Sequence, residues 1–205
     1  MTQAPEAATY VDPATGSRYP LDVPRWRSDG GGPLMITDLP GLGRRDIDTA
    51  ERSLWRYRRA LALVIDDPVS LGEGLTPLVQ RTFRGTKAHF KLEWFAPSGS
   101  FKDRGATVMV SALRQQGVRH ILEDSSGNGG AAIATYAAAA GIKSKILTPA
   151  STQPGKLVQM RACGAEVELV PGTRQATADE AERQASSIFY ASHNWQPFFL
   201  QGTKT

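Results

Sequence analysis

The second half of the chain alternates between two hydrophobic patterns. Short runs rich in valine, isoleucine and leucine alternate with longer segments whose apolar residues recur three and four positions apart. The first pattern is typical of buried strands, and the second is typical of helices that bury one face. The predicted strands are 119–122, 145–148, 166–170 and 188–191. The predicted helices are 106–116, 130–140, 155–163 and 178–187. Regular alternation of this kind predicts an α/β fold with a parallel sheet.

Two possible helix starts carry the spacing of a capping box. Thr177 and Glu180 lie three residues apart, so the last helix is expected to begin beside them. Asp48 and Glu51 have the same spacing, and they predict a helix that runs to about Leu61.

The residues before 106 follow less regular patterns. Residues 1–40 are rich in proline, glycine and polar side chains, which predicts an irregular N-terminal arm on the surface of a domain. Segments 78–84 and 87–95 are each extended in character and flank Gly85, so they predict a β-hairpin.

The composition is that of an ordinary soluble globular protein. The chain has 205 residues, of which 40% are hydrophobic and 21% are charged. No apolar run is long enough to cross a bilayer, and the first residues lack the pattern of a secretion signal. We therefore expect no membrane partner and a cytoplasmic location. The single cysteine, Cys163, excludes an internal disulfide and a cysteine-rich zinc site, and no metal site is predicted.

The charge balance is mildly basic, with a formal net charge of +4. Part of the excess lies in one segment, which carries Arg52, Arg56, Arg58 and Arg59. A basic patch can attract nucleic acid, but no nucleic-acid-binding module accompanies this one. A solvated helix face is the better interpretation, and an anionic substrate or cofactor also fits the excess. No nucleic-acid partner is predicted.

Lys102 stands where a predicted strand gives way to a predicted helix. Pro97 and Gly99 break the strand, and Ser98 or Ser100 could cap the new helix. The positive end of a helix dipole disfavours a cation in the first turn, and the same field favours a neutral, nucleophilic amine. The alternative interpretation is a solvated lysine in a loop.

A second stretch, 123–130, joins a strand to an alanine-rich helix. Its glycines allow the backbone to approach a ligand, and N–H groups at a helix start bind anions. Ser125, Ser126 and Asn128 add neutral hydrogen-bonding groups. Ligands of parallel sheets gather beyond the carboxyl ends of the strands, where this loop is expected to lie. A plain strand-to-helix turn is the alternative.

These stretches together resemble a known signature. The segment Ser98-Gly-Ser-Phe-Lys-Asp-Arg-Gly105, followed by Ser125-Ser-Gly-Asn-Gly-Gly130, resembles that of fold-type II pyridoxal-phosphate enzymes. Within that group the chain is most similar to threonine synthases. The segment Leu71-Gly-Glu-Gly-Leu-Thr-Pro-Leu78 adds a third motif in the order that the family has. The likeness runs from about Ser70 to the last residue.

The resemblance implies a tryptophan synthase β-like architecture, a three-layer αβα arrangement around a parallel sheet. Residues 1–40 would form the arm, and 41–118 would form the first part of the large cofactor domain. Residues 119–205 would form a small α/β domain. The chain looks like the N-terminal half of such an enzyme, because the family's glycine-rich phosphate loop and its residue facing the pyridine nitrogen are expected later in the sequence.

The resemblance also implies roles for individual residues. Lys102 would be the catalytic lysine that forms the Schiff base with pyridoxal 5'-phosphate, and Asn128 would hydrogen-bond the ring hydroxyl of that cofactor. Asp103 and Arg104 would anchor the loop, while Phe101 is expected in the core. Four loop residues would receive the substrate carboxylate or border the ring: Ser125, Ser126, Gly127 and Gly129. The segment 71–78 either borders the active site or is a surface turn.

The implied reaction is a lyase reaction that converts O-phosphohomoserine to threonine. A serine/threonine ammonia-lyase, or another β- or γ-replacement enzyme, would carry the same motifs. A truncated, non-catalytic paralogue is the alternative outside enzymes. The expected partner is a small amino-acid substrate, phosphorylated or not, and the protein could form a homo-oligomer.

Overall fold

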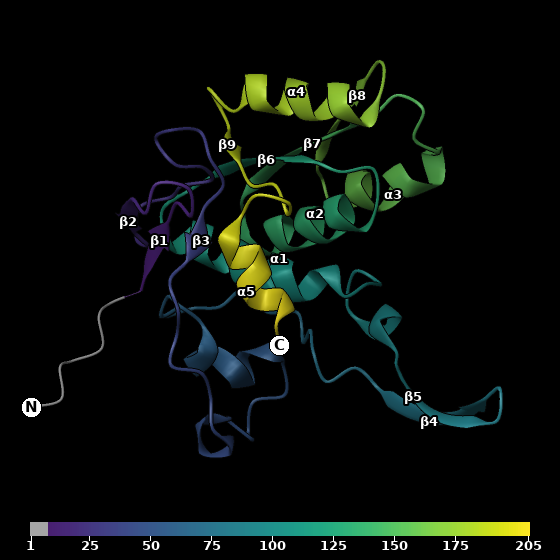
Figure 1. The fold of residues 1–205 in the computed structure, drawn as a ribbon. Coiled ribbons are helices and arrows are strands. Elements are labelled where there is room, and N and C mark those ends of the chain that lie inside the picture. The colour runs from purple at the N-terminus through teal and green to yellow at the C-terminus, as the bar shows by residue number, and fades with distance from the viewer. Residues whose placement is uncertain (1–7) are drawn as a thin grey trace, which may run out of the picture.

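The computed structural model describes residues 8–205 and is built around one parallel sheet (Figure 1). This four-stranded sheet has the order β8-β7-β6-β9. Its strands are β6 (His120–Asp124), β7 (Lys143–Pro149), β8 (Glu166–Val170) and β9 (Phe189–Tyr190). All three strand pairs are parallel, as the alternating pattern predicted.

Helices cover both faces of this sheet and give it three layers (Figure 1). One side carries α1 (Lys102–Gln115), α2 (Asn128–Ala140), α3 (Pro154–Ala162) and α5 (Pro197–Thr203). The other side carries α4 (Arg174–Gln184). Ile121 and Ile146 join the larger core with α1 and α2, whereas their neighbours Leu122 and Leu147 pack with α4. Successive strand residues face opposite sides, so each apolar strand supplies both cores.

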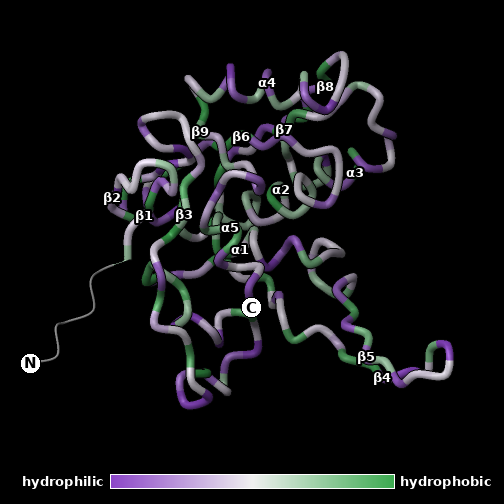
Figure 2. The backbone as a smooth tube through the Cα atoms, viewed as in Figure 1, coloured by the Kyte–Doolittle hydropathy of each residue, from purple (hydrophilic) through white to green (hydrophobic). Residues whose placement is uncertain are grey.

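The helices differ in hydropathy according to their surroundings. Helix α2 lies at the centre and is largely hydrophobic, while α4 at the outside carries many hydrophilic residues (Figure 2). The predicted three-layer α/β arrangement is therefore confirmed.

The N-terminal segment contains three short strands that its sequence pattern did not predict. These strands, β1 (Thr9–Val11), β2 (Arg18–Pro20) and β3 (Met35–Ile36), form an antiparallel sheet of order β2-β1-β3. Tyr10 is fully buried, and its ring meets that of Phe198 edge-on at a centroid distance of 5.7 Å. The small sheet is thereby attached to α5.

The predicted hairpin is confirmed by β4 (Leu78–Phe83) and β5 (Thr86–Lys91). Gly85 closes its turn with a φ of +78°, a conformation that favours glycine. The hairpin projects from the rest of the chain (Figure 1), and Leu78 and Phe83 on it are exposed.

The predicted helix from Asp48 to Leu61 is wrong for its first half. A 3₁₀ helix, η2 (Leu54–Ala60), forms instead, and the Ser53 side chain accepts a hydrogen bond from the amide of Trp55 at its start. The Asp48 carboxylate accepts hydrogen bonds from the amides of Ala50 and Glu51 in a tight turn. Such local side-chain bonds compete with helix formation. Two further 3₁₀ turns are η1 (Arg44–Asp46) and η3 (Glu93–Phe95).

The predicted start of the last long helix is also wrong. Helix α4 begins at Arg174, and the Thr173 hydroxyl caps it by accepting a 3.2 Å hydrogen bond from the amide of Ala176. Thr177 is buried inside the helix, where its hydroxyl donates to the carbonyl of Thr173. The helix starts one turn earlier because Pro171 and Gly172 already end the preceding strand.

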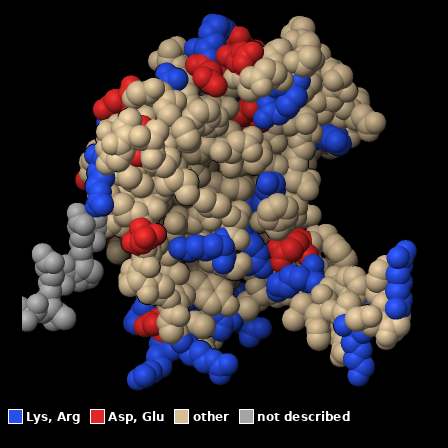
Figure 3. All heavy atoms as spheres, viewed as in Figure 1, with Lys and Arg blue, Asp and Glu red and all other residues tan. Residues whose placement is uncertain are grey.

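Basic side chains gather on two parts of the surface. Lys and Arg lie along the projecting hairpin and over the region of η2 (Figure 3). Arg58 and Arg59 are exposed there and form ion pairs with Glu51 and Asp46. Exposure of these two arginines agrees with the solvated face that the sequence favoured.

Candidate active site

Lys102 faces a cavity of about 550 Å³ that also receives the loop before α2. The structure brings Lys102 together with Ser125, Gly127, Asn128 and Gly129 around this cavity. Ser126, between them in sequence, is not part of the lining. The remaining lining residues come from α2, α3 and the segment after β9: Ala131, Gly155, Lys156, Gln159 and His193. No Asp or Glu is among the described residues that line it, so the cavity suits an anionic ligand.

The loop before Lys102 is held by the residue that follows it. The Asp103 carboxylate accepts a 2.7 Å hydrogen bond from the amide of Ser98 and another from the Ser98 hydroxyl. Burial raises the pKa of Asp103, and the Ser98 hydrogen bonds oppose that rise. The Ser100 hydroxyl accepts from the amide of Lys102 at 3.3 Å. The anchoring role expected of Asp103 is confirmed, and it places Lys102 at the first position of α1.

Arg104 ties the start of α1 to the segments before it. Its guanidinium donates to both carboxylate oxygens of Glu93, at 2.9 and 3.0 Å. The Thr76 hydroxyl donates to the same carboxylate at 2.6 Å, which links the segment 71–78 to this cluster. Arg104 holds the pKa of Glu93 below its usual range, against the effect of burial. The anchoring role expected of Arg104 is confirmed.

Phe101 does not lie in the core, contrary to the prediction. Its side chain is 46% exposed, and the Lys102 Nζ atom lies 4.7 Å from the centroid of its ring. The same Nζ lies 5.7 Å from the ring centroid of Phe199. Phe101 precedes the first turn of α1, where side chains project to the surface, so it flanks the lysine.

The two glycines at the start of α2 allow close packing. A Cβ atom at Gly129 would lie 2.8 Å from Cε1 of His193 and 2.9 Å from the Ser125 hydroxyl. A Cβ atom at Gly130 would lie 3.0 Å from the carbonyl oxygen of Ser125. Asn128 is the first residue of α2, so unpaired N–H groups at this helix end are directed toward the cavity region.

The sequence did not single out Glu123 and His193, which meet beside this cavity. His193 Nδ1 lies 2.5 Å from Oε1 of Glu123, and the His193 amide donates to Oε2 at 3.1 Å. Glu123 is fully buried, which raises the pKa of its carboxyl group, and His193 opposes that rise. A glutamate within an apolar strand was the available signal, but its partner lies 70 residues away.

The next residue, Asp124, faces the other side of β6. Its carboxylate accepts hydrogen bonds from the Tyr190 hydroxyl at 2.5 Å and the Ser192 hydroxyl at 3.0 Å, and it pairs with Arg174. Burial raises the pKa of Tyr190, and the bond to Asp124 adds to that rise. These bonds hold β9 and the chain after it beside β6, which places His193 at the cavity.

The segment 71–78 is anchored inside the molecule at two positions. Glu73 and Thr76 are buried, whereas Leu71 and Leu75 are exposed. None of these residues lines the Lys102 cavity. The segment is therefore a structural support for the site rather than a plain surface turn.

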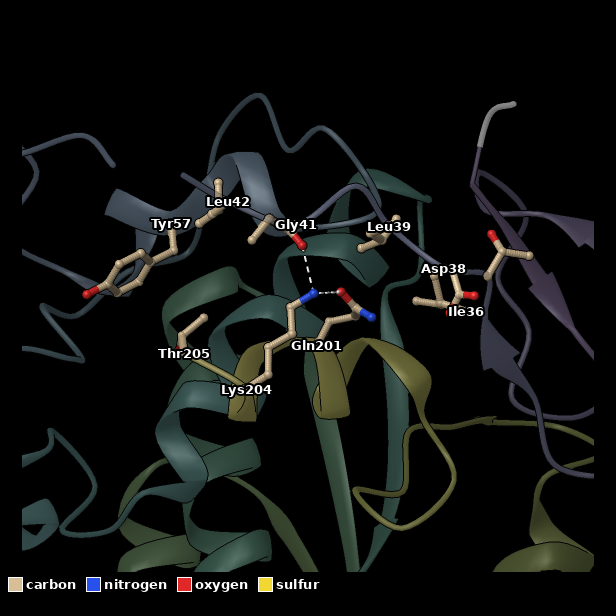
Figure 4. A pocket seen from close by; sticks show the side chains of 11 residues that line it. Ile36, Asp38, Leu39, Gly41, Leu42, Tyr57, Gln201, Lys204 and Thr205 are labelled. Atoms are coloured by element: carbon tan, nitrogen blue, oxygen red, sulfur yellow. Dashed lines mark hydrogen bonds between the residues drawn. The ribbon is translucent and has the colours of Figure 1, made fainter. Parts of the chain in front are cut away.

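A second cavity, of about 540 Å³, lies between residues 36–42, η2 and α5 (Figure 4). Its lysine, Lys204, donates hydrogen bonds to the carbonyl of Ala60 at 2.7 Å and to the side chain of Gln201 at 2.6 Å. Burial lowers the pKa of Lys204. The Lys204 amine already donates to protein groups, so it is less available to a ligand. The cavity at Lys102 is therefore the better candidate for an active site.

Comparison with known proteins identifies the family. A family model described as "Pyridoxal-phosphate dependent enzyme" matches residues 69–205. The chain belongs to this family. The predicted resemblance and the predicted cofactor, pyridoxal phosphate, are thereby confirmed at the level of the family.

The similar curated proteins include several threonine synthases. That of Methanocaldococcus jannaschii is 35% identical over 203 residues, covering 93% of this chain and 50% of the relative. That of Mycobacterium tuberculosis is 37% identical over 157 residues, covering 73% of this chain and 44% of the relative. The chain thus spans about half the length of the curated relatives it matches.

Solved structures share the fold. A hydrogen sulfide-producing enzyme from Fusobacterium nucleatum has a TM-score of 0.54 at 32% identity, covering 59% of this chain and 43% of that one. Maize serine racemase has a TM-score of 0.56 at 26% identity, covering 62% of this chain and 41% of that one. Among residues 8–205, none of the helices has both the length and the apolar character needed to span a bilayer.

The side chains around the cavity fit the family's cofactor. Lys102 supplies an amine between two aromatic rings, and Asn128 supplies a neutral amide at a helix start. Lys156 adds a second cation to the lining. An aldehyde, a ring hydroxyl and an anionic group would each find a chemically suitable partner among these residues.

Proposed function

We propose that these residues form the lysine-bearing part of a pyridoxal-phosphate-dependent lyase of the threonine synthase type. The single observation that carries the proposal is the meeting of Lys102 with the loop 125–129 at one cavity. The proposed substrate is O-phosphohomoserine, and the proposed product is threonine. The threonine synthases among the similar proteins support this choice over an ammonia-lyase.

Lys102 and Asn128 would hold the cofactor, Lys102 through its amine and Asn128 through its amide. When bound, pyridoxal phosphate supplies an electron sink for the carbanion formed at the α-carbon of an amino acid. Lys102 would accept the α-proton of the substrate, because a general base must lie within hydrogen-bond reach of the proton it moves. Ser125, Gly127 and Gly129 line the cavity and would orient the substrate carboxylate, whereas Ser126, expected with them, lies outside the lining.

A labelling experiment tests the assignment of Lys102. The purified protein is incubated with pyridoxal phosphate, reduced with borohydride, digested and analysed by mass spectrometry. We expect the phosphopyridoxyl group on Lys102, and we expect Lys102→Arg to remove it, because a guanidinium does not condense with the aldehyde. Lys156→Arg is the matched control, since Lys156 lines the same cavity and its loss should leave the Lys102 label intact.

Phosphate release from O-phospho-L-homoserine tests the substrate. We expect turnover only from a full-length protein that contains this chain together with the part of the relatives that it does not cover. That cofactor-loaded protein should release inorganic phosphate and form threonine, and its Lys102→Arg variant should do neither. In the labelling experiment, a phosphopyridoxyl group on another lysine would contradict the assignment of Lys102. Deamination of L-serine or L-threonine without phosphate release would favour the ammonia-lyase.

A further inference from the structure

Glu123 fixes the orientation of the His193 ring at the cavity. Both carboxylate oxygens bind His193, Oε1 at Nδ1 and Oε2 at the backbone amide. Glu123 has no exposed surface, and the side chain of His193 is 14% exposed. A carboxylate that accepts from Nδ1–H leaves Nε2 as the nitrogen that gains and loses a proton.

The imidazole and the Lys102 amine lie beside the same aromatic ring. The centroid of His193 is 5.6 Å from that of Phe199, and the Lys102 Nζ atom is 5.7 Å from the Phe199 centroid. On the other side, Gly129 is so close to the imidazole that any side chain there would collide with it. His193 is therefore confined between α5 and the loop proposed to hold the substrate carboxylate.

Lys102 and His193 also line the same two cavities. Lys102 and His193 both line the 550 Å³ cavity, and both line an adjoining one of about 330 Å³. The chain contains three histidines, and the other two, His89 and His120, line neither cavity. A carboxylate-oriented imidazole next to a catalytic amine is an arrangement suited to proton transfer.

We infer that His193 is a second proton-transfer residue of this site and that Glu123 is its positioning residue. The inference rests on the proposed function and deepens it. The Lys102 amine takes a proton from the β-carbon, and the electron pair of that C–H bond forms a double bond to the γ-carbon. The imidazolium gives its Nε2 proton to the phosphate oxygen that leaves the γ-carbon, and that oxygen keeps the electron pair of its broken C–O bond. Lys102 then returns its proton to the γ-carbon, and a water molecule bonds through its oxygen to the β-carbon and gives a proton to Nε2. The imidazolium is thereby restored.

The charged groups near His193 come from three elements, β6, α1 and α3. Glu123 on β6 faces the ring directly, and Asp124 beside it raises the pKa of Glu123 further. Lys102 on α1 and Lys156 on α3 also line the cavity. Helix α5 contributes the Phe199 ring to the surroundings of His193. Glu123 is therefore the charged group that contacts the imidazole directly.

The first test examines the contact between Glu123 and His193 in the absence of substrate. Diethylpyrocarbonate modifies neutral imidazole, and mass spectrometry reports the labelling rate at His193 and at His89 on the hairpin. We expect Glu123→Gln to raise the rate at His193 severalfold, because the ring loses the carboxylate that holds it in place. The rate at His89 should stay unchanged. An unchanged rate at His193 would overturn the inference, even with Lys102 labelled as expected.

The second test separates the role of His193 from that of Lys102. The cofactor-loaded protein is incubated with O-phospho-L-homoserine in D₂O, and both α-proton exchange and phosphate release are followed. The variant His193→Asn keeps an amide for Glu123 but no titrating nitrogen. We expect it to retain exchange and to lose phosphate release by about 10²- to 10⁴-fold. Phosphate release at the wild-type rate, or loss of both activities in a folded variant, would overturn the inference.

Failure of the proposed function would look different. A wild-type protein that is not labelled at Lys102 would overturn the proposed function, while the diethylpyrocarbonate measurement would still decide whether Glu123 positions the His193 ring.

Discussion

The hydroxyl group of Tyr136 donates a 2.7 Å hydrogen bond to Oε2 of Glu73, and both side chains are fully buried. Glu73 also accepts from the Ser70 hydroxyl at 3.0 Å and from the amide of Leu71 at 2.9 Å. Burial raises the pKa of Tyr136, and the Glu73 charge adds to that rise. The Gly-Glu-Gly segment is thereby joined to the helix that begins at Asn128.

Removal of the Tyr136 hydroxyl should destabilise the fold. Tyr136→Phe leaves a buried carboxylate short of one donor, and such a loss costs about 1 to 3 kcal/mol of unfolding free energy. Urea unfolding followed by circular dichroism measures this difference. The control is Tyr57→Phe, because the Tyr57 side chain is partly exposed and the change should be near zero. Equal stability of the two variants would contradict a supporting role for Glu73.

The contact between α1 and α5 should not tolerate a side chain at Gly105. A Cβ atom there would lie 2.5 Å from the ring of Phe199, which also flanks Lys102. We expect Gly105→Ala to cost about 1 to 3 kcal/mol, as overpacked cores do. Gly155→Ala is a matched control in the first turn of α3, where a Cβ atom meets nothing within 4 Å. That control should leave the thermal midpoint unchanged or raise it, and a similar loss in both variants would refute the packing argument.

Loss of the Asn128 amide should weaken cofactor binding. Asn128→Ala would remove the hydrogen bond that the amide is proposed to make to the bound cofactor. Such a loss is worth about 1 to 3 kcal/mol, or on the order of 5- to 150-fold in the dissociation constant. Fluorescence titration with pyridoxal phosphate measures the change. Ser126→Ala should leave this constant unchanged, because Ser126 lies outside the described lining of the cavity. An unchanged affinity of the Asn128→Ala variant for pyridoxal phosphate would show that Asn128 does not bind the cofactor.

The ion pair between Glu93 and Arg104 should make stability depend on pH. The pKa of Glu93 is lowered in the folded protein, chiefly by Arg104, from an ordinary value of 4.5. Its contribution is therefore present above pH 4.5 and is lost as the pH falls through the folded value. We expect Glu93→Gln to be less stable than wild type by about 1.5 to 3 kcal/mol at pH 7.

The stability gap between Glu93→Gln and wild type should then close below pH 4.5. Urea unfolding midpoints of wild type and Glu93→Gln, measured from pH 7 to pH 3, test this expectation. A gap that stays constant over this range would show that the charge of Glu93 is not the source of its contribution.

The sequence by itself determined the elements whose signals are local. The strand at 166–170 follows from a short apolar run, and its bounds agree with β8. The order of strands and helices after residue 106 follows from hydrophobic periodicity, because burial of one helix face or both strand faces constrains nearly every residue involved. The place of Lys102 in the first turn of a helix follows from the proline and glycine before it. Asn128 was expected in the loop before the next helix, whereas α2 already begins at Asn128.

The tertiary structure alone decided which distant side chains meet. The pairing of Glu123 with His193, and that of Glu73 with Tyr136, joins residues 70 and 63 positions apart. Phe101 is exposed because it precedes the first turn of α1 and flanks Lys102, which its apolar character alone does not reveal. Hydrophobic periodicity reports only whether a position is buried. The partner of a buried charge depends on how strands and helices pack, and that packing is settled by contacts along the whole chain.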